Sequence, residues 1–182
     1  VKGVSLSVRR GEILGIGGLV GAGRSELVEG IFGMHELASG EIFVKGKQVK
    51  VHSPKDIIKE GVALITEDRK VTGLNLSGSV NDNIAMVAIK KLLSHGLYDP
   101  DIIILDEPTR GIDVGAKRDI YLLLGKLVQQ GKAVIMISSE IPELMGVCDR
   151  IMVMCEGNLS GEVQRDAFSQ ERIMTLASAI EV

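Results

Sequence analysis

Residues 18–25 read Gly-Leu-Val-Gly-Ala-Gly-Arg-Ser, and this stretch decides the fold. An apolar run predicted to be a strand, residues 12–17, precedes it, and a helical pattern over residues 25–32 follows. The glycines let the backbone curl so that successive N–H groups point at phosphate oxygens, and the helix N-terminus adds partial positive charge. The pattern therefore predicts a phosphate-binding loop in which Ser25 ligates Mg²⁺. A glycine-rich turn without a ligand would have the same pattern.

Arg24 stands where this loop pattern has lysine. Arginine keeps the positive charge, but it replaces a compact ammonium with a wide planar fork. We therefore expect nucleotide binding to survive and the handling of the γ-phosphate to be altered.

A second apolar run, residues 101–105, ends in Asp106 and Glu107. Open α/β sheets bind ligands at the carboxyl ends of their strands, so these acids are placed to face a ligand. Asp106 is predicted to hold Mg²⁺, and Glu107 to activate the attacking water as a general base. A strand that ends in two solvated acids is the simpler alternative. The position of Asp106, 81 residues after Ser25 and in the expected order, favours the nucleotide site.

Strands alternate with helices along the chain, which predicts an α/β fold with a parallel sheet and a small hairpin around Gly46. The expected strands cover residues 4–8, 12–17, 41–44, 48–51, 62–66, 101–105, 133–138, 150–154 and 158–163. The expected helices cover residues 25–32, 54–61, 80–93, 114–130, 139–146 and 169–179. The expected helix caps are Ser53, Asp113 and either Ser138 or Ser139.

Composition narrows the class of protein. The 182 residues suffice for one domain, 45% of them are hydrophobic, and the net charge of −3 argues against nucleic acid as the main partner. No run of 18 apolar residues and no signal peptide is present, so we expect any membrane role to be docking from the cytosol. Cys148 and Cys155 lack metal-ligand spacing and are predicted to be reduced, mostly buried thiols.

Residues 106–117, Asp-Glu-Pro-Thr-Arg-Gly-Ile-Asp-Val-Gly-Ala-Lys, resemble the Walker B motif and D-loop of the ABC ATPases that serve ribose, galactose and xylose importers. Residues 18–26 resemble the arginine-containing Walker A motif of the second cassette in those tandem proteins, and residues 65–74 and 134–144 resemble that same cassette. The resemblance covers nearly the whole chain. It implies a P-loop NTPase core, with a mostly parallel sheet flanked by helices and a small antiparallel β subdomain.

The resemblance also implies the site. ATP would be bound by Gly18, Gly21, Ala22, Gly23, Arg24, Ser25, Glu26, Glu67, Asp113 and Ser139, with Mg²⁺ on Ser25 and Asp106 and with Glu107 catalytic. Glu67 matches the usual glutamine, and its charge disfavours a closed ATP-bound geometry. Ser139 matches the switch histidine but lacks its reach and its cationic form. Asp113 matches the D-loop aspartate that crosses the dimer interface. We expect the departures from the family pattern at Arg24, Glu67 and Ser139 to weaken hydrolysis.

The cassette is expected to be incomplete, as a single domain over residues 1–182 with its helical signature subdomain largely absent. The segment Leu-Ser-Gly-Ser at residues 76–79 lies in the wrong place to be the signature loop. In the family, several dozen residues separate the counterparts of Gly96 and Leu97, which are adjacent here. The adenine-stacking aromatic of the family would lie before Val1. We therefore expect a missing segment between residues 96 and 97.

The resemblance implies an ATPase that energises import of a monosaccharide. Its expected partners are a second cassette, membrane permease subunits and, indirectly, a sugar-binding protein, at the cytoplasmic face of the bacterial inner membrane. A regulatory cassette that binds ATP with little turnover is one alternative. A non-transport ABC ATPase is another, which the acidic pI of about 5.7 argues against.

Overall fold

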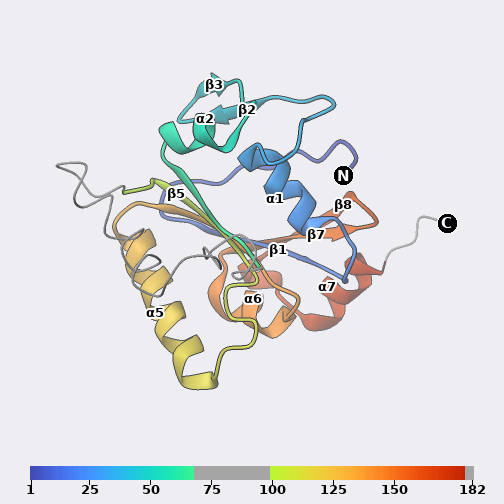
Figure 1. The fold of residues 1–182 in the computed structure, drawn as a ribbon. Helices are drawn as coiled ribbons and strands as arrows, with labels where there is room; N and C mark the ends of the chain where they lie inside the picture. The colour runs from blue at the N-terminus through green and yellow to red at the C-terminus, as the bar shows by residue number, and fades with distance from the viewer. Residues whose placement is uncertain (68–98, 179–182) are drawn as a thin grey trace, which may run out of the picture.

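The computed structural model describes residues 1–67 and 99–178, and a six-stranded sheet forms its centre (Figure 1). The strand order is β4-β5-β6-β1-β7-β8; β8 is antiparallel to β7, and the other neighbours are parallel. The strands of this sheet are β1 (Ile13–Gly18), β4 (Val62–Ile65), β5 (Ile102–Asp106), β6 (Ala133–Ile137), β7 (Arg150–Cys155) and β8 (Asn158–Gln164). A separate antiparallel hairpin consists of β2 (Ile42–Val44) and β3 (Lys47–Val49). The predicted α/β class and the mostly parallel sheet are confirmed.

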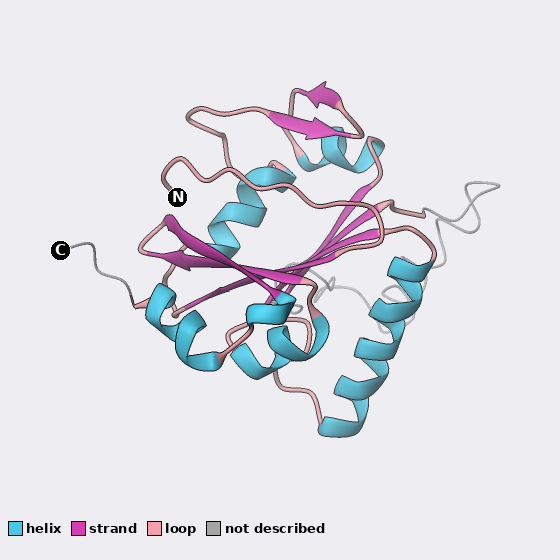
Figure 2. Ribbon diagram, turned by 180° about the vertical axis from the view of Figure 1, so that it is seen from behind, coloured by secondary structure: helices cyan, strands magenta, loops and turns pink. Residues whose placement is uncertain are grey.

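Helices cover both faces of the sheet, as the two opposite views show (Figures 1 and 2). One face carries α1 (Arg24–Phe32), α2 (Pro54–Lys59) and the hairpin. The other carries α5 (Val114–Gln129), α6 (Ile141–Val147) and α7 (Gln170–Ala177), the last preceded by the 3₁₀ turn η1 (Arg165–Ala167). Ser53 and Pro54 begin α2 as predicted, and the Asp56 carboxylate accepts the N–H of Ser53 at 3.0 Å.

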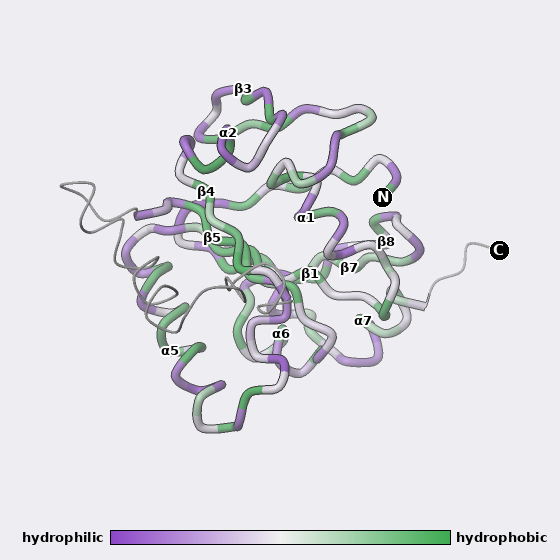
Figure 3. Tube along the Cα trace, viewed as in Figure 1, coloured by the Kyte–Doolittle hydropathy of each residue, from purple (hydrophilic) through white to green (hydrophobic). Residues whose placement is uncertain are grey.

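The sheet is buried on both faces, which explains why its strands are continuous apolar runs. Hydrophobic colouring follows these central strands (Figure 3). On one face, Val28 of α1 and Ile57 of α2 pack with residues of β1 and β6. On the other, Leu124, Leu144 and Ile173 pack from α5, α6 and α7. Aliphatic side chains therefore fill the core, in accord with an aromatic content of only 3%.

The predicted strand over residues 4–8 is wrong. Val4, Leu6 and Val8 do pack on the core, which accounts for the alternating pattern, but the segment forms no β-ladder. Neither Ser138 nor Ser139 is the N-cap of α6, because that helix begins at Ile141, two residues later than predicted, and its N-cap is Glu140. The Ser138 hydroxyl nevertheless accepts the N–H of Glu140 at 3.0 Å.

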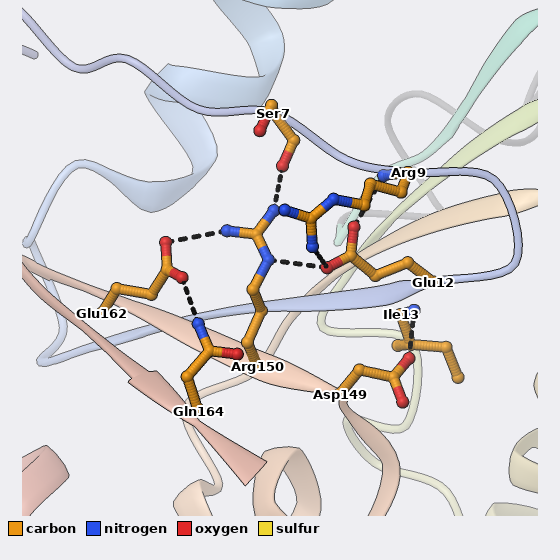
Figure 4. A network of polar contacts seen from close by, with 8 residues as sticks. All are labelled: Ser7, Arg9, Glu12, Ile13, Asp149, Arg150, Glu162 and Gln164. Carbon is orange, nitrogen blue, oxygen red and sulfur yellow. Dashed lines mark hydrogen bonds and ion pairs between the residues drawn. The ribbon is translucent and has the colours of Figure 1, made fainter.

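The segment before β1 forms no β-ladder, and a buried ion pair between Arg150 and Glu12 holds it instead (Figure 4). Arg150 and Glu12 are 6% and 7% exposed, and Nε of Arg150 lies 2.6 Å from Oε1 of Glu12. The same guanidinium contacts the Ser7 carbonyl and pairs with Glu162 at 2.8 Å. Its bonds therefore join the segment before β1 to β7 and β8.

Several predicted features lie outside the described residues. These are the helix over residues 80–93, the segment 76–79 and the junction between residues 96 and 97. In the part that is described, no helix has the length and apolarity needed to cross a bilayer. Both cysteines are free thiols, with Cys148 buried and Cys155 partly exposed.

Candidate nucleotide-binding site

The carboxyl ends of three parallel strands meet at one edge of the sheet. Asp106, the last residue of β5, pairs in register with Ile137, the last residue of β6. Ile16 of β1 is aligned with the same residue from the other side. The loop that follows β1 therefore leaves the sheet at the edge where Asp106 ends β5. Parallel pairing brings together these distant parts of the sequence.

The loop backbone requires its glycines. Gly21 and Gly23 have φ of 82° and 89°, in the left-handed region that glycine adopts without strain. A Cβ on Gly18 would lie 2.5 Å from the carbonyl oxygen of Met154, so no side chain fits there. The buried Ala22 accepts the N–H of Gly157 at 3.0 Å, which fixes the loop against the β7–β8 turn.

Helix α1 begins without a side-chain cap. Its N-cap residue is Gly23, which has no side chain to accept the N–H groups of the first turn. Uncapped N–H groups and the helix dipole favour an anion at this position. Ser25 is half-buried in this first turn, whereas Glu26 is exposed.

The Arg24 side chain turns into the protein. Its guanidinium is 8% exposed and donates to the Ser138 carbonyl at 2.7 Å. The other terminal nitrogen lies 3.4 Å from Oε1 of Glu107. Arg24 thus joins the loop after β1 to the ends of β5 and β6, through contacts that the sequence did not predict.

Glu107 occupies an unusual backbone conformation directly after β5. Its φ is 47°, its N–H bonds the Ile137 carbonyl at 3.0 Å, and its carboxylate accepts the Ser139 hydroxyl at 3.2 Å. A non-glycine residue in this region is held there by its surroundings, a state common at functional sites. Burial raises the pKa of Glu107, although Arg24 and Ser139 act in the opposite direction. A carboxyl group with a raised pKa suits a general base.

Asp106 is the strongest candidate for a metal ligand. It is 4% exposed, and its Oδ1 is buried without any hydrogen-bond partner. Burial raises the pKa of this carboxyl group, whereas the Ser25 hydroxyl and Arg24 lower it. A buried unpartnered carboxylate oxygen beside a hydroxyl fits a magnesium ion that takes its remaining ligands from phosphates and water. Within residues 1–67 and 99–178, no cluster of three or more His, Cys, Asp or Glu side chains could hold a metal ion by itself.

Two more predicted residues, Glu67 and Asp113, are exposed. Glu67 is exposed and pairs with Arg110, a residue of the turn after β5. Asp113 is exposed, and its carboxylate caps α5 by accepting the N–H groups of Gly115 and Ala116 at 3.0 and 3.1 Å. The predicted capping role of Asp113 is confirmed.

A buried hydrogen-bond network around Glu143 connects to the site through Ser138, and no sequence pattern predicted it. The Glu143 carboxylate of α6 accepts hydroxyl groups from Thr109, Tyr121 and Ser138. The only sequence signal was an acid on a short helix whose neighbours Ile141 and Leu144 are apolar, a position where a solvated side chain is not expected.

A comparison with protein families matches the ABC transporter family over residues 1–96, which is more than half of the chain. The chain belongs to the ABC transporter family. The ribose import ATP-binding protein of Clostridium tetani is 42% identical over 226 aligned residues, which cover 98% of this chain and 45% of the relative. A putative ribose/galactose/methyl galactoside import ATP-binding protein of Halalkalibacterium halodurans is 41% identical, covering 96% of this chain and 42% of the relative.

The chain of this ABC transporter family member spans about half the length of the curated relatives that it matches. Among solved structures, a nucleotide-free ATP-binding cassette from an ABC transporter superposes with a TM-score of 0.73. It is 18% identical, and the match covers 98% of this chain and 92% of that one. This likeness confirms the P-loop ATPase fold expected from the sequence.

Proposed function

We propose that this chain is the nucleotide-binding unit of an ABC importer for monosaccharides, and that it binds Mg·ATP at the carboxyl edge of its sheet. One observation carries the proposal. The loop over residues 18–25 and the acids Asp106 and Glu107 share one edge of the sheet, where Asp106 has a buried, unpartnered oxygen. The 42% identity to a ribose import protein supports a sugar as the transported solute.

The roles within the pocket follow from its chemistry. The N–H groups of the loop and of the first turn of α1 hold the phosphates. Ser25 and Asp106 hold Mg²⁺, which when bound supplies positive charge to the phosphate oxygens. Glu107 accepts a proton from the attacking water, and Ser139 keeps that carboxylate oriented through its hydroxyl.

The chain is one part of a larger transporter. The chain is proposed to be the second half of a tandem protein and to pair with the cassette that precedes it. Its other proposed partners are permease subunits at the cytoplasmic face of the bacterial inner membrane. A sugar-binding protein acts indirectly, and no nucleic acid is involved. The alignment with the ribose import protein runs over 226 residues, more than the 182 residues of the chain, so that relative has positions that this chain lacks. We propose that they belong between residues 96 and 97.

A regulatory role is the second candidate, and the contact of Arg24 with Glu107 favours it. The guanidinium holds the carboxylate that would have to accept a proton from water. In this case the pocket binds ATP and contributes to closure of the pair of cassettes, while the pocket of the other cassette hydrolyses ATP.

Glu107→Gln in the intact two-cassette protein separates the two candidates. If this pocket hydrolyses ATP, the ATPase rate and sugar uptake in reconstituted vesicles fall by at least about a hundredfold, the lower end of the range typical of losing a general base. Glu171→Gln, at an exposed position of α7, is the matched control. Unchanged turnover in Glu107→Gln with intact Mg·ATP binding would establish the regulatory role. A wild-type protein that binds no Mg·ATP would contradict both.

A further inference from the structure

Glu143 is a buried carboxylate in contact with three hydroxyl groups, one from α5, one from the turn after β5 and one from the residue after β6. It is 7% exposed, while Thr109 and Ser138 are 1% and 0% exposed. Its Oε1 accepts Thr109 at 2.5 Å and Tyr121 of α5 at 2.8 Å, and its Oε2 accepts Ser138. Burying a carboxylate is costly without such donors, so this network is maintained against a desolvation penalty.

The phenol of Tyr121 is a fixed donor in this network. Burial and the neighbouring Glu143 raise the pKa of Tyr121, so the hydroxyl remains protonated and donates to the carboxylate. The orientation of Glu143 is therefore set from α5 as well as from its own helix.

Ser138 connects this network to the nucleotide site. Its hydroxyl donates to Glu143 and also accepts the Glu140 N–H, which fixes the turn after β6. Its carbonyl, on the other side of the same residue, accepts Arg24 at 2.7 Å. The next residue, Ser139, donates to Glu107 at 3.2 Å. Glu143 thus holds the hydroxyl of Ser138 in the turn after β6. The Ser138 carbonyl and the Ser139 hydroxyl of the same turn contact the charged groups of Arg24 and Glu107.

Thr109 supplies a second connection. It lies two residues after Glu107, in the segment that leads to the Asp113 cap of α5. By accepting the Thr109 hydroxyl, the Glu143 carboxylate restrains the segment that follows Glu107 in the chain.

We infer that Glu143 is a positioning residue of the nucleotide pocket, which holds the turns at Ser138 and Thr109 on either side of Glu107. The inference rests on the proposed nucleotide-binding function and extends it. Glu143 touches neither Arg24 nor Glu107 in the described contacts, and it acts through the backbone and hydroxyl of Ser138.

Glu143→Gln tests the inference, because it keeps the side-chain volume and replaces one acceptor oxygen with an NH₂ donor. The single amide oxygen cannot accept on both sides, so either the Ser138 hydroxyl or the pair Thr109 and Tyr121 loses its acceptor. Glu12→Gln is the matched control. Glu12 is also 7% exposed and hydrogen-bonded, but it precedes β1, at the opposite end of that strand from the site.

Three measurements on this chain decide the matter: the melting temperature, the Kd of Mg·ATP by calorimetry, and amide hydrogen exchange in the peptide that contains Ser139 and Glu140. Both variants should melt at lower temperature than the wild type. Only Glu143→Gln should raise the Kd, by about tenfold for the loss of a charged hydrogen bond, and speed exchange in that peptide. If Glu143→Gln does not fold, Ser138→Ala replaces it, because it removes only the connecting hydroxyl.

Wild-type Kd and exchange rates in the Glu143→Gln variant would overturn the inference and leave the proposed function intact. A rise in Kd of the same size in Glu12→Gln would also overturn it, because the effect would then follow from stability alone. A wild-type chain that binds no Mg·ATP would overturn the proposed function. Exchange in the ligand-free chain would then still decide whether Glu143 holds the turn.

Discussion

Asp106→Asn should stabilise the ligand-free chain and at the same time abolish its response to magnesium. The wild-type carboxylate is 4% exposed, and its Oδ1 has no partner. Burying a carboxylate with an unsatisfied oxygen costs about 1–3 kcal/mol, and asparagine keeps the shape but removes the charge that makes this burial costly. For a chain of this length each kcal/mol corresponds to about 2–4 °C, so the melting temperature should rise by about 2–12 °C.

The stability gained by Asp106→Asn should depend on pH. Burial raises the pKa of Asp106 above its ordinary value of 3.8, so the folded state binds the proton more tightly than the unfolded state. Stability from this group is therefore fully present below pH 3.8 and is lost as the pH rises through the folded-state pKa. The advantage of Asp106→Asn should be larger at pH 8 than below pH 3.8.

Calorimetric melting with and without Mg·ATP measures both effects. At a ligand concentration of about 100 times Kd, the wild type should gain about 2.7 kcal/mol. Asp106→Asn should lose the part of this gain that depends on magnesium. Asp119→Asn, at an exposed position of α5, is the control and should change neither quantity. A lower melting temperature for ligand-free Asp106→Asn, or an undiminished magnesium response, would refute the assignment of Asp106 as a metal ligand.

Two further predictions concern the rest of the fold. Burial raises the pKa of Glu12, but the hydrogen bonds from Arg150 and the Arg9 N–H together with the charges of Arg150 and Arg9 outweigh burial, so the net pKa lies below the ordinary value of 4.5. The stability from this pair should be present above pH 4.5 and be lost as the pH falls through the folded-state pKa, and acid titration of Glu12→Gln should lack that component. Burial raises the pKa of the Cys148 thiol, so iodoacetamide should label Cys155 first and Cys148 only after unfolding; equal labelling rates in the native chain would contradict the buried position of Cys148.

The sequence predicted the elements of the core because their signals are local. The apolar runs at β1, β5 and β6 and the glycines before α1 each restrict the backbone by themselves. The same reasoning failed for residues 4–8. Their alternation reports a buried side, but a strand also needs a neighbour with free N–H and C=O groups, and neighbours are decided by the tertiary structure.

The sequence by itself determined that a phosphate-binding loop and an acidic strand end occur in one α/β domain. The tertiary structure was needed to show which residues surround this loop and these acids. Arg24 contacts the Ser138 carbonyl 114 residues away, and Glu143 accepts hydroxyl groups from three separate parts of the chain. Such contacts leave no periodic pattern in the sequence. The role of a buried polar side chain depends on its hydrogen-bond partners in the folded protein and not on its neighbours along the chain.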